Sequence, residues 1–178
     1  ALGPLPRLKG LDLENTRVTG RGLPRFPRLN SLNLGGTDID DDGLRQIGQI
    51  DSLTDVALKE TAISDDGLAH LAPLQNLYVL TLSGTLVSSR GIKQLGHRPQ
   101  LKILQLDWTL VDNDAIETLS TYPQLMELTL DGTRVSDLGG VRLARLPNLF
   151  FVSLKYTSVT SRSVQVLLGS NPEMMISR

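Results

Sequence analysis

The 178-residue sequence contains no cysteine, which excludes disulfide bonds, thiolate metal sites and a cysteine nucleophile. It also lacks any run that approaches 18 consecutive apolar residues and any basic segment followed by an apolar one at its start, so we expect a soluble chain with no membrane partner. The chain begins at Ala1, directly in a repeat, so we expect an excised or processed piece. We expect it to be a monomer, or part of a larger chain.

The sequence also has no large excess of charge of one sign. The 18 Lys and Arg residues nearly balance the 19 Asp and Glu residues, for a formal net charge of -1. No large positive field is therefore available to attract a phosphate backbone or an anionic bilayer, and nucleic acid is not an expected partner. With 40% hydrophobic residues, the chain has enough apolar material to bury a core.

What the sequence does contain is a repeat with a period of 24 residues. Each repeat starts at an anchor leucine, carries an apolar residue three places later and a leucine five places later, and therefore reads L-x-x-L-x-L. A threonine follows each anchor by eight places, from Thr16 to Thr157. We predict one domain over residues 1–178 with a partial eighth repeat from about residue 172. The anchors are Leu8, Leu29, Leu53, Leu77, Leu101, Leu125 and Leu149.

The alternation in L-x-L predicts one short strand per repeat with its leucines turned inward. Strands that recur in one direction form a parallel sheet and need a crossover of a dozen or more residues. The crossover reads as a short helix, because a residue able to cap a helix stands eleven places after each anchor. These predicted N-caps are Thr19, Asp40, Ser64, Ser88, Asp112, Ser136 and Thr160.

In these motifs the sequence resembles the leucine-rich-repeat family, from about Leu5 to about Leu168. It looks most like bacterial repeats of 24 residues and like the cysteine-containing subclass of F-box adaptors, with threonine where relatives have asparagine or cysteine. The resemblance implies an α/β right-handed solenoid, with a parallel β-sheet on the concave face and short helices on the convex face. Since a hydroxyl offers one donor where an amide offers two, each threonine should tie fewer backbone groups of the neighbouring turn.

Two repeats depart from the pattern. The first is short and contains Pro24 and Pro27, so we expect no full helix there. In the sixth, Gly139 and Gly140 replace the usual pair of glycine and leucine or isoleucine, which removes a core side chain and should weaken the helix start by ~1–2 kcal/mol.

The expected binding surface is the concave sheet of the C-terminal half, where outward positions become apolar and aromatic. Trp108 has Gly84 and Gly132 at the matching positions of its neighbours, which leaves room for the indole to lie across the sheet. Aromatic anchors ringed by polar residues are typical of interface hot spots, and the acidic residues beside them favour a cationic element on the partner. The candidate residues are Tyr78, Val79, Ile103, Asp107, Trp108, Met126, Glu127, Asp131, Phe151 and Tyr156.

An alternative for part of this set is that rings such as Phe150, Phe151 and Tyr156 fold back to cover loops or the C-terminal end of the stack. A second pattern, Asp38 to Gly43, matches the first six places of an EF-hand calcium loop, but the twelfth place is Gln49 instead of glutamate. We interpret this stretch as a capped helix start with acidic residues favoured by the helix dipole.

No catalytic site, metal-ligand spacing or phosphate loop is recognisable, and we expect no cofactor. His70 and His97 fall in predicted helical, convex segments of different repeats, which favours surface histidines over a general base. The sequence thus predicts a module that binds another protein or peptide. The alternatives are the substrate-recognition arm of an F-box-like ubiquitin-ligase adaptor or effector, which would need an F-box-like helical segment before Ala1, and an enzyme, which would need a deep polar pocket shared by several repeats.

Overall fold

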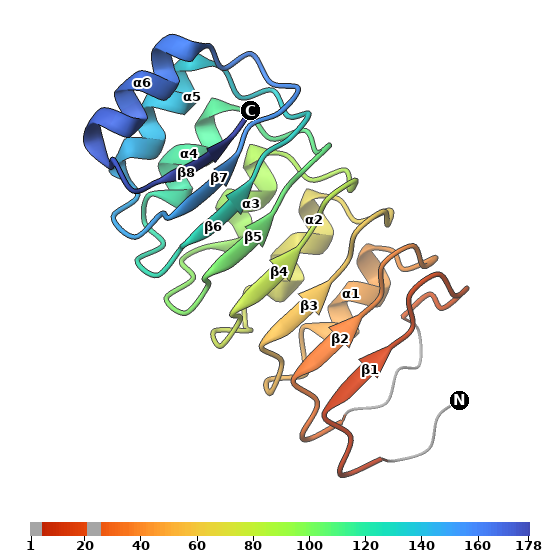
Figure 1. Cartoon of the computed structure of the whole chain (residues 1–178). Helices are drawn as coiled ribbons and strands as arrows, with labels where there is room; N and C mark the ends of the chain where they lie inside the picture. The colour runs from red at the N-terminus through yellow and green to blue at the C-terminus, as the bar shows by residue number, and fades with distance from the viewer. Residues whose placement is uncertain (1–4, 21–25) are drawn as a thin grey trace.

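The chain winds into a stack of strand, loop and helix units whose strands lie side by side in one sheet. The computed structural model describes residues 5–20 and 26–178, and in this part of the chain the sheet has eight parallel strands in chain order. Figure 1 shows the helices on one face of the sheet and strands β1 and β8 at opposite ends of the stack. The strands are β1 Gly10–Asp12, β2 Ser31–Asn33, β3 Asp55–Ala57, β4 Val79–Thr81, β5 Ile103–Gln105, β6 Glu127–Thr129, β7 Phe151–Ser153 and β8 Met175–Ser177.

Helices occupy the crossovers from the second repeat to the seventh. Residues 21–25 of the first repeat, where we expect no full helix, lie outside the described residues. The architecture is the α/β leucine-rich-repeat solenoid that the sequence predicts. The helical segments are α1 Asp41–Ile47, α2 Asp65–Leu68, η1 Ala69–Leu71, α3 Ser89–Leu95, α4 Asn113–Leu119, α5 Asp137–Arg142, η2 Leu143–Arg145 and α6 Ser161–Ser170.

The core lies between the sheet and the helices. The middle residues of neighbouring strands pair in register, as Leu80 does with Leu104, and both are fully buried. Helix residues such as Leu68 and Ile92 pack on them from the other side. Burying each such side chain contributes about 1.5–3 kcal/mol. The inward leucines therefore decide which side chains are left on the open face of the sheet.

The threonine column closes each repeat on itself, which corrects our expectation. In all seven repeats the hydroxyl donates to the carbonyl three residues earlier, as from Thr109 to Leu106 at 2.6 Å. The threonine side chain is short and reaches only its own turn. Neighbouring repeats are joined instead by backbone bonds beyond the strands, such as that from the Trp108 N–H to the Asp131 carbonyl at 2.7 Å.

The helices begin where the N-cap pattern predicts. The side chain of the N-cap accepts from a first-turn amide at Asp40, Ser64, Ser88 and Asp112, so the cap interpretation of the Asp38 to Gly43 stretch is confirmed. Ser136 and Thr160 make no such bond. At Ser136 the preceding repeat supplies the acceptor, since Asn113 Oδ1 accepts from the first-turn N–H of Gly139 at 2.9 Å. At α6, Asp137 Oδ1 accepts from the N–H of the N-cap Thr160 itself at 2.6 Å.

A small residue follows each of these helix starts, and at Gly67, Gly91 and Gly139 a first-turn side chain of the previous repeat fills the space. A Cβ on Gly67 would overlap Oδ1 of Asp41. That carboxylate accepts from the N–H of Ser64 at 2.9 Å and from its hydroxyl at 2.5 Å. Where the corresponding first-turn residue is the shorter Ser89, the small position holds Ala115. Asp137, in contrast, faces Ser163, whose hydroxyl donates to its Oδ1 at 2.5 Å. The residues at the two positions therefore contact each other across neighbouring repeats, and the fit differs from pair to pair.

The sixth repeat is less disturbed than its two glycines suggest. Helix α5 forms there, and Gly140 is buried. A Cβ on Gly140 would lie 3.2 Å from side-chain atoms of Val159 and Ser163. Side chains of the next repeat therefore occupy part of the space that leucine or isoleucine takes in other repeats, and the remaining cost is the low helix propensity of glycine, about 1 kcal/mol.

One charged side chain, Arg98, is buried in the core between α3 and β5, with only 2% of its surface exposed. Its guanidinium donates to the carbonyls of Ala72 and Leu74, both at 3.0 Å, and to that of Leu95. These carbonyls follow or end helical segments, where partial negative charge favours a cation. Burial lowers the pKa of Arg98 and raises that of Tyr122 in the next repeat.

Candidate partner-binding surface

The outward residues of the strands form a continuous row on the open face of the sheet. Val79, Ile103, Glu127 and Phe151 are successive partners in the parallel register, and the row continues to Met175 of β8. Glu127 is exposed, whereas Val79, Ile103 and Phe151 are half-buried. The structure therefore brings these four predicted residues together on one face.

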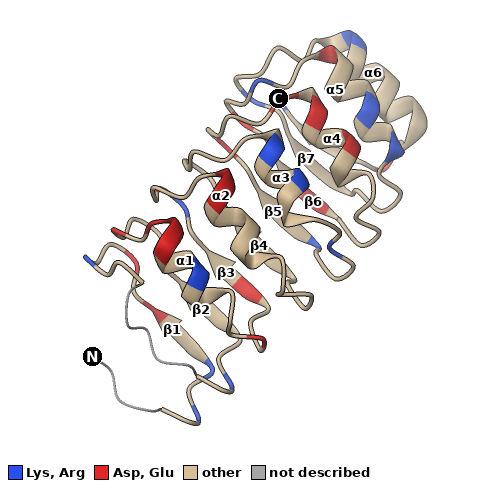
Figure 2. Ribbon diagram, turned by 180° about the vertical axis from the view of Figure 1, so that it is seen from behind, with Lys and Arg blue, Asp and Glu red and all other residues tan. Residues whose placement is uncertain are grey.

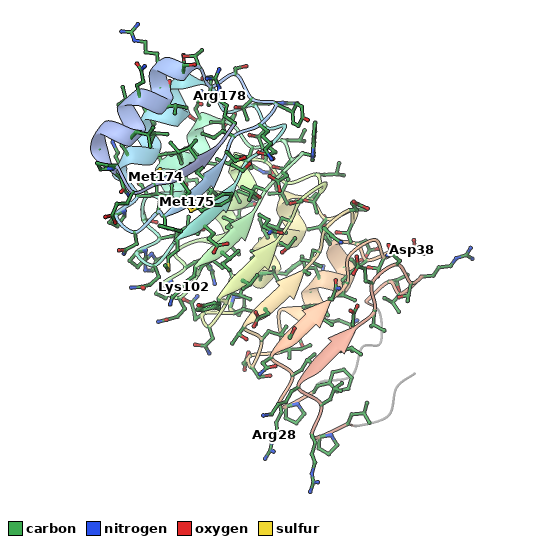
Figure 3. All side chains as sticks on the ribbon, viewed as in Figure 1. Arg28, Asp38, Lys102, Met174, Met175 and Arg178 are labelled. Atoms are coloured by element: carbon green, nitrogen blue, oxygen red, sulfur yellow. The ribbon has the colours of Figure 1, made fainter. Side chains whose placement is uncertain are left out.

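A second group lies at the edge where the strands begin, which we call the strand-start edge. Tyr78, Met126 and Phe150 each occupy the place before a strand and are exposed by 42%, 41% and 48%. Lys102 stands between the first two, and its ammonium lies 5.0 Å from the centroid of the Tyr78 ring. Figure 3 labels Lys102 and Arg28 along this edge. The sequence argument missed Lys102, although its place one residue after an anchor leucine was readable.

A shallow groove of about 590 Å³ opens beside Tyr78 on the same edge. Asp55 is half-buried there, and its carboxylate accepts the hydroxyl of Thr54 at 2.5 Å. The groove adds a polar border to the exposed ring of Tyr78. It is lined by Thr54, Asp55, Asn76, Tyr78 and Gln100.

Trp108 and Tyr156 lie at the opposite edge, where the strands end and the chain turns toward the helices. We call it the strand-end edge. Both are strongly exposed, by 61% and 78%, so Tyr156 does not fold back over the end of the stack. Their ring centroids are 5.6 Å apart at an interplanar angle of 31°. Sequence reasoning found both residues but did not pair them, since they belong to repeats two apart.

The pairing follows from an unusual backbone position. The residue seven places after each anchor has a positive φ, and in the second, fourth and sixth repeats it is glycine. In the fifth and seventh it is Trp108 and Tyr156, both with a φ of 57°. A Cβ on Gly132 would lie 2.6 Å from Cδ2 and Cζ3 of Trp108. The indole therefore lies across Gly132, as the sequence predicted, and this brings it to Tyr156.

Asp107 and Asp131 precede Trp108 and Gly132 and are half-buried. Asp107 accepts the hydroxyls of Ser83 at 3.1 Å and Thr129 at 2.6 Å, and the N–H of Asp131 at 2.8 Å. Oδ1 of Asp131 accepts the hydroxyl of Ser153 at 2.6 Å and the N–H of Lys155 at 2.8 Å. Both carboxylates thus hold neighbouring loops together and place negative charge beside the indole.

Two further apolar residues of the strand-end edge escaped the sequence argument. Leu86 is 57% exposed and Leu110 is 40% exposed. Both stand nine places after an anchor leucine, one residue before a buried valine and two before a helix N-cap. With Trp108 and Tyr156 they make up what we call the apolar rim.

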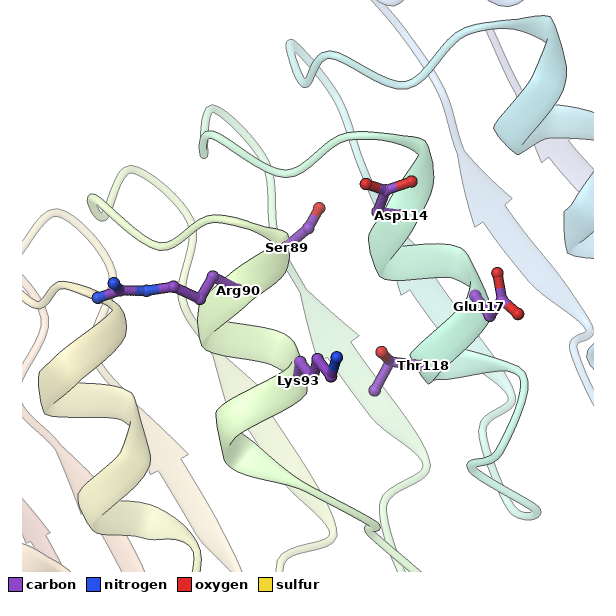
Figure 4. A pocket seen from close by; sticks show the side chains of 6 residues that line it. All are labelled: Ser89, Arg90, Lys93, Asp114, Glu117 and Thr118. Carbon is purple, nitrogen blue, oxygen red and sulfur yellow. The ribbon is translucent and has the colours of Figure 1, made fainter.

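The helix face offers a charged groove of about 550 Å³ between α3 and α4. Figure 2 shows basic residues on α3 beside acidic ones on α4, and Figure 4 shows the lining side chains. Arg90 points away from α4 and pairs with Asp65 at 3.3 Å and Asp66 at 2.6 Å. The groove is open to solvent and holds no buried polar group among its described residues, so we assign it no ligand.

The histidines lie on the helix side of the stack. His70 belongs to η1, as the prediction of a helical segment required, and His97 lies two residues beyond the end of α3. Within residues 5–20 and 26–178 no three His, Cys, Asp or Glu side chains gather as a metal site would require. In the same part of the chain, no helix has both the length and the apolar character needed to cross a bilayer.

The sequence matches no family model and no curated protein, but the fold is shared with solved leucine-rich-repeat structures. An internalin C2 from Listeria monocytogenes superposes with a TM-score of 0.78 at 25% identity, over 97% of this chain and 71% of that one. A leucine-rich-repeat protein from Leptospira interrogans gives 0.66 at 18% identity, over 97% and 49%. The mouse RP105/MD-1 complex gives 0.76 at 19% identity, over 96% and 30%. The chain therefore has the leucine-rich-repeat fold.

Proposed function

We propose that this chain is a protein-interaction module that binds a protein or peptide partner with the open face of its sheet and the strand-end edge of repeats three to seven. Trp108 is the central anchor, and Tyr78, Val79, Ile103, Met126, Glu127 and Phe151 extend the contact across the sheet face. Similarity to leucine-rich-repeat structures, one of which was solved as the RP105/MD-1 complex, supports this class of function.

The observation that carries the proposal is the backbone conformation of Trp108 and Tyr156. A residue with a side chain costs about 1–2 kcal/mol in the left-handed region, whereas glycine adopts it freely. Glycine occupies this position in both neighbouring repeats, as Gly84 and Gly132, whereas Asn15 and Glu60 occupy it in the first and third repeats. The partial burial of a ring that stays 61% exposed roughly offsets that cost and adds little net stability. Folding alone therefore gives little reason for tryptophan here, and binding a partner gives a better one.

Exposed aromatic rings on a rigid scaffold are also efficient contact residues, because few rotatable bonds are lost on binding. Trp108 rests on Gly132 and stands beside Tyr156, so its orientation is already set in the free protein. A preorganised ring loses less conformational entropy when a partner covers it.

The test is capture of a partner followed by affinity measurement with Trp108→Ala. We expect an affinity loss of about 2 kcal/mol or more, roughly thirty-fold in the dissociation constant. The matched control is Leu138→Ala, which removes an apolar side chain exposed by 56% on helix α5. Equal affinity of Trp108→Ala and the unchanged chain for an identified partner would refute the assignment of this surface.

A further inference from the structure

The indole of Trp108 presents one open face. Its other face lies on Gly132, whose missing side chain makes the contact possible. Tyr156 stands beside it, with ring centroids 5.6 Å apart. An open indole face carries a concentration of negative potential and is the aromatic surface that attracts cations most strongly.

Two carboxylates flank this site in the chain. Asp107 precedes Trp108 in the chain, and Asp131 precedes the glycine on which the ring lies. Glu60 occupies the left-handed position two repeats earlier, and its side chain lies over Gly84, 3.3 Å from where a Cβ would be. Basic residues of this edge stand in other repeats: Lys59 of the third pairs with Glu14 at 2.7 Å, and Arg134 and Lys155 belong to the sixth and seventh. The loop of the fifth repeat, residues 107–114, contains acidic but no basic residues, so its charge beside Trp108 is negative.

One of these carboxylates has an oxygen to spare. Both bonds that Asp131 accepts from the described residues reach Oδ1. Its Oδ2 can accept an N–H from outside the chain. Asp131 is also half-buried beside the indole, where a charged hydrogen bond is less screened than in open water.

A contact between a cation and an aromatic ring is already present at the strand-start edge. Lys102 lies over the exposed ring of Tyr78 at 5.0 Å. Among the described residues no cation occupies the corresponding place over Trp108. The stronger aromatic acceptor, with the more negative surroundings, is thus the one left open.

We propose that Trp108 and Asp131 together receive an arginine side chain of the partner, with the guanidinium stacked on the indole and an N–H donated to Oδ2 of Asp131. Arginine fits better than lysine, because its planar guanidinium can stack on a ring and donate sideways at the same time. The inference rests on the proposed function, since it assumes that a peptide or protein docks on the strand-end edge.

The test uses the fluorescence of Trp108, the only tryptophan in the chain. The probes are two peptides, acetyl-Leu-Arg-Leu-amide and its citrulline counterpart, which has nearly the same shape and no charge. We expect a saturable change in Trp108 emission with the arginine peptide, at least five-fold weaker binding of the citrulline peptide, and weaker arginine binding at high salt. Equal binding of the two peptides, or no binding of either, would overturn the arginine assignment.

A matched pair of variants tests whether the negative charge of Asp131 contributes to binding of the arginine peptide. Asp131→Asn keeps an acceptor for Ser153 and Lys155 but removes the negative charge, and we expect it to weaken the arginine peptide about five-fold. Glu117→Gln removes the same charge on the helix face and should leave the affinity unchanged. Equal effects of the two variants would exclude a local role for Asp131. An emission change with chitotriose but not with the arginine peptide would assign the rim to a carbohydrate and reject the inference.

The two proposals fail in different ways. If Trp108→Ala abolishes capture of an identified partner while the peptides show no preference for charge, the interaction surface stands and the arginine assignment falls. If the partner binds Trp108→Ala normally, the surface itself is wrong, and the arginine site loses the function on which it rests.

Discussion

At the strand-end edge every repeat closes its turn with the same hydrogen bond, whereas at the strand-start edge the bonding side chain varies among the repeats. Seven threonines donate to a carbonyl three residues back. On the other side, Ser52 bonds to the Leu29 carbonyl at 2.6 Å, Asn148 to that of Pro123 at 2.6 Å, and Arg98 to three carbonyls. At the strand-end edge each threonine makes one such bond, so replacing one threonine should remove one hydrogen bond from the stack. At the strand-start edge a single residue such as Arg98 makes several bonds, so its replacement should remove them all.

The largest effect is expected at Arg98. Arg98→Ala removes the donor to three buried carbonyls, and we expect the free energy of unfolding to fall by about 3 kcal/mol. Thr109→Val removes one hydroxyl bond at the strand-end edge and should cost about 1 kcal/mol. Urea denaturation of both variants checks the difference. Similar losses would show that the strand-start edge does not depend on Arg98.

A smaller effect is expected where the two coupled positions of neighbouring helices meet. Gly67→Ala forces a methyl group against Asp41 and displaces its bonds to Ser64, so we expect a loss of about 2 kcal/mol. The chain already shows a compatible pair in Ser89 and Ala115. Adding Asp41→Ser to Gly67→Ala should therefore restore part of the stability. Strictly additive losses in the double-mutant cycle would disprove the coupling.

The smallest effect on stability is expected at Trp108 itself. Trp108→Gly relieves the left-handed backbone by about 1 kcal/mol and loses the contact of a mostly exposed ring, so the two nearly cancel. We expect the free energy of unfolding to change by less than about 1 kcal/mol, measured by urea denaturation. A loss above about 2 kcal/mol would make the indole a packing residue and remove the main argument for a binding role.

The strand-end edge was largely predictable, because its features recur within one repeat. The inward leucines, the helix starts and the glycines beside Trp108 all depend on short spacings, and each is found as expected. The threonine bonds were placed wrongly, because spacing shows that a hydroxyl recurs but not which carbonyl it meets. The coupling of Asp41 with Gly67 was also missed, since it joins residues 26 positions apart in different repeats.

The candidate binding surface was likewise predictable only in part. The outward positions of strand residues such as Val79 and Ile103 follow from the alternation of inward and outward side chains alone. The contact of Lys102 with Tyr78 and the pairing of Trp108 with Tyr156 depend on how repeats stack and how far a side chain leans across its neighbour. Leu86 and Leu110 lie outside the strands, where side chains do not alternate between the two faces of a sheet. Their exposure therefore follows only from the folded structure.

By itself the sequence determined the repeat, the parallel sheet and the face on which side chains are left open, because these depend on periodic burial of apolar residues within 24 positions. Only the tertiary structure decided that Arg98 is buried among carbonyls and that the indole of Trp108 rests on Gly132 beside Asp131. Those outcomes depend on distances between side chains of different repeats, and linear spacing does not contain them.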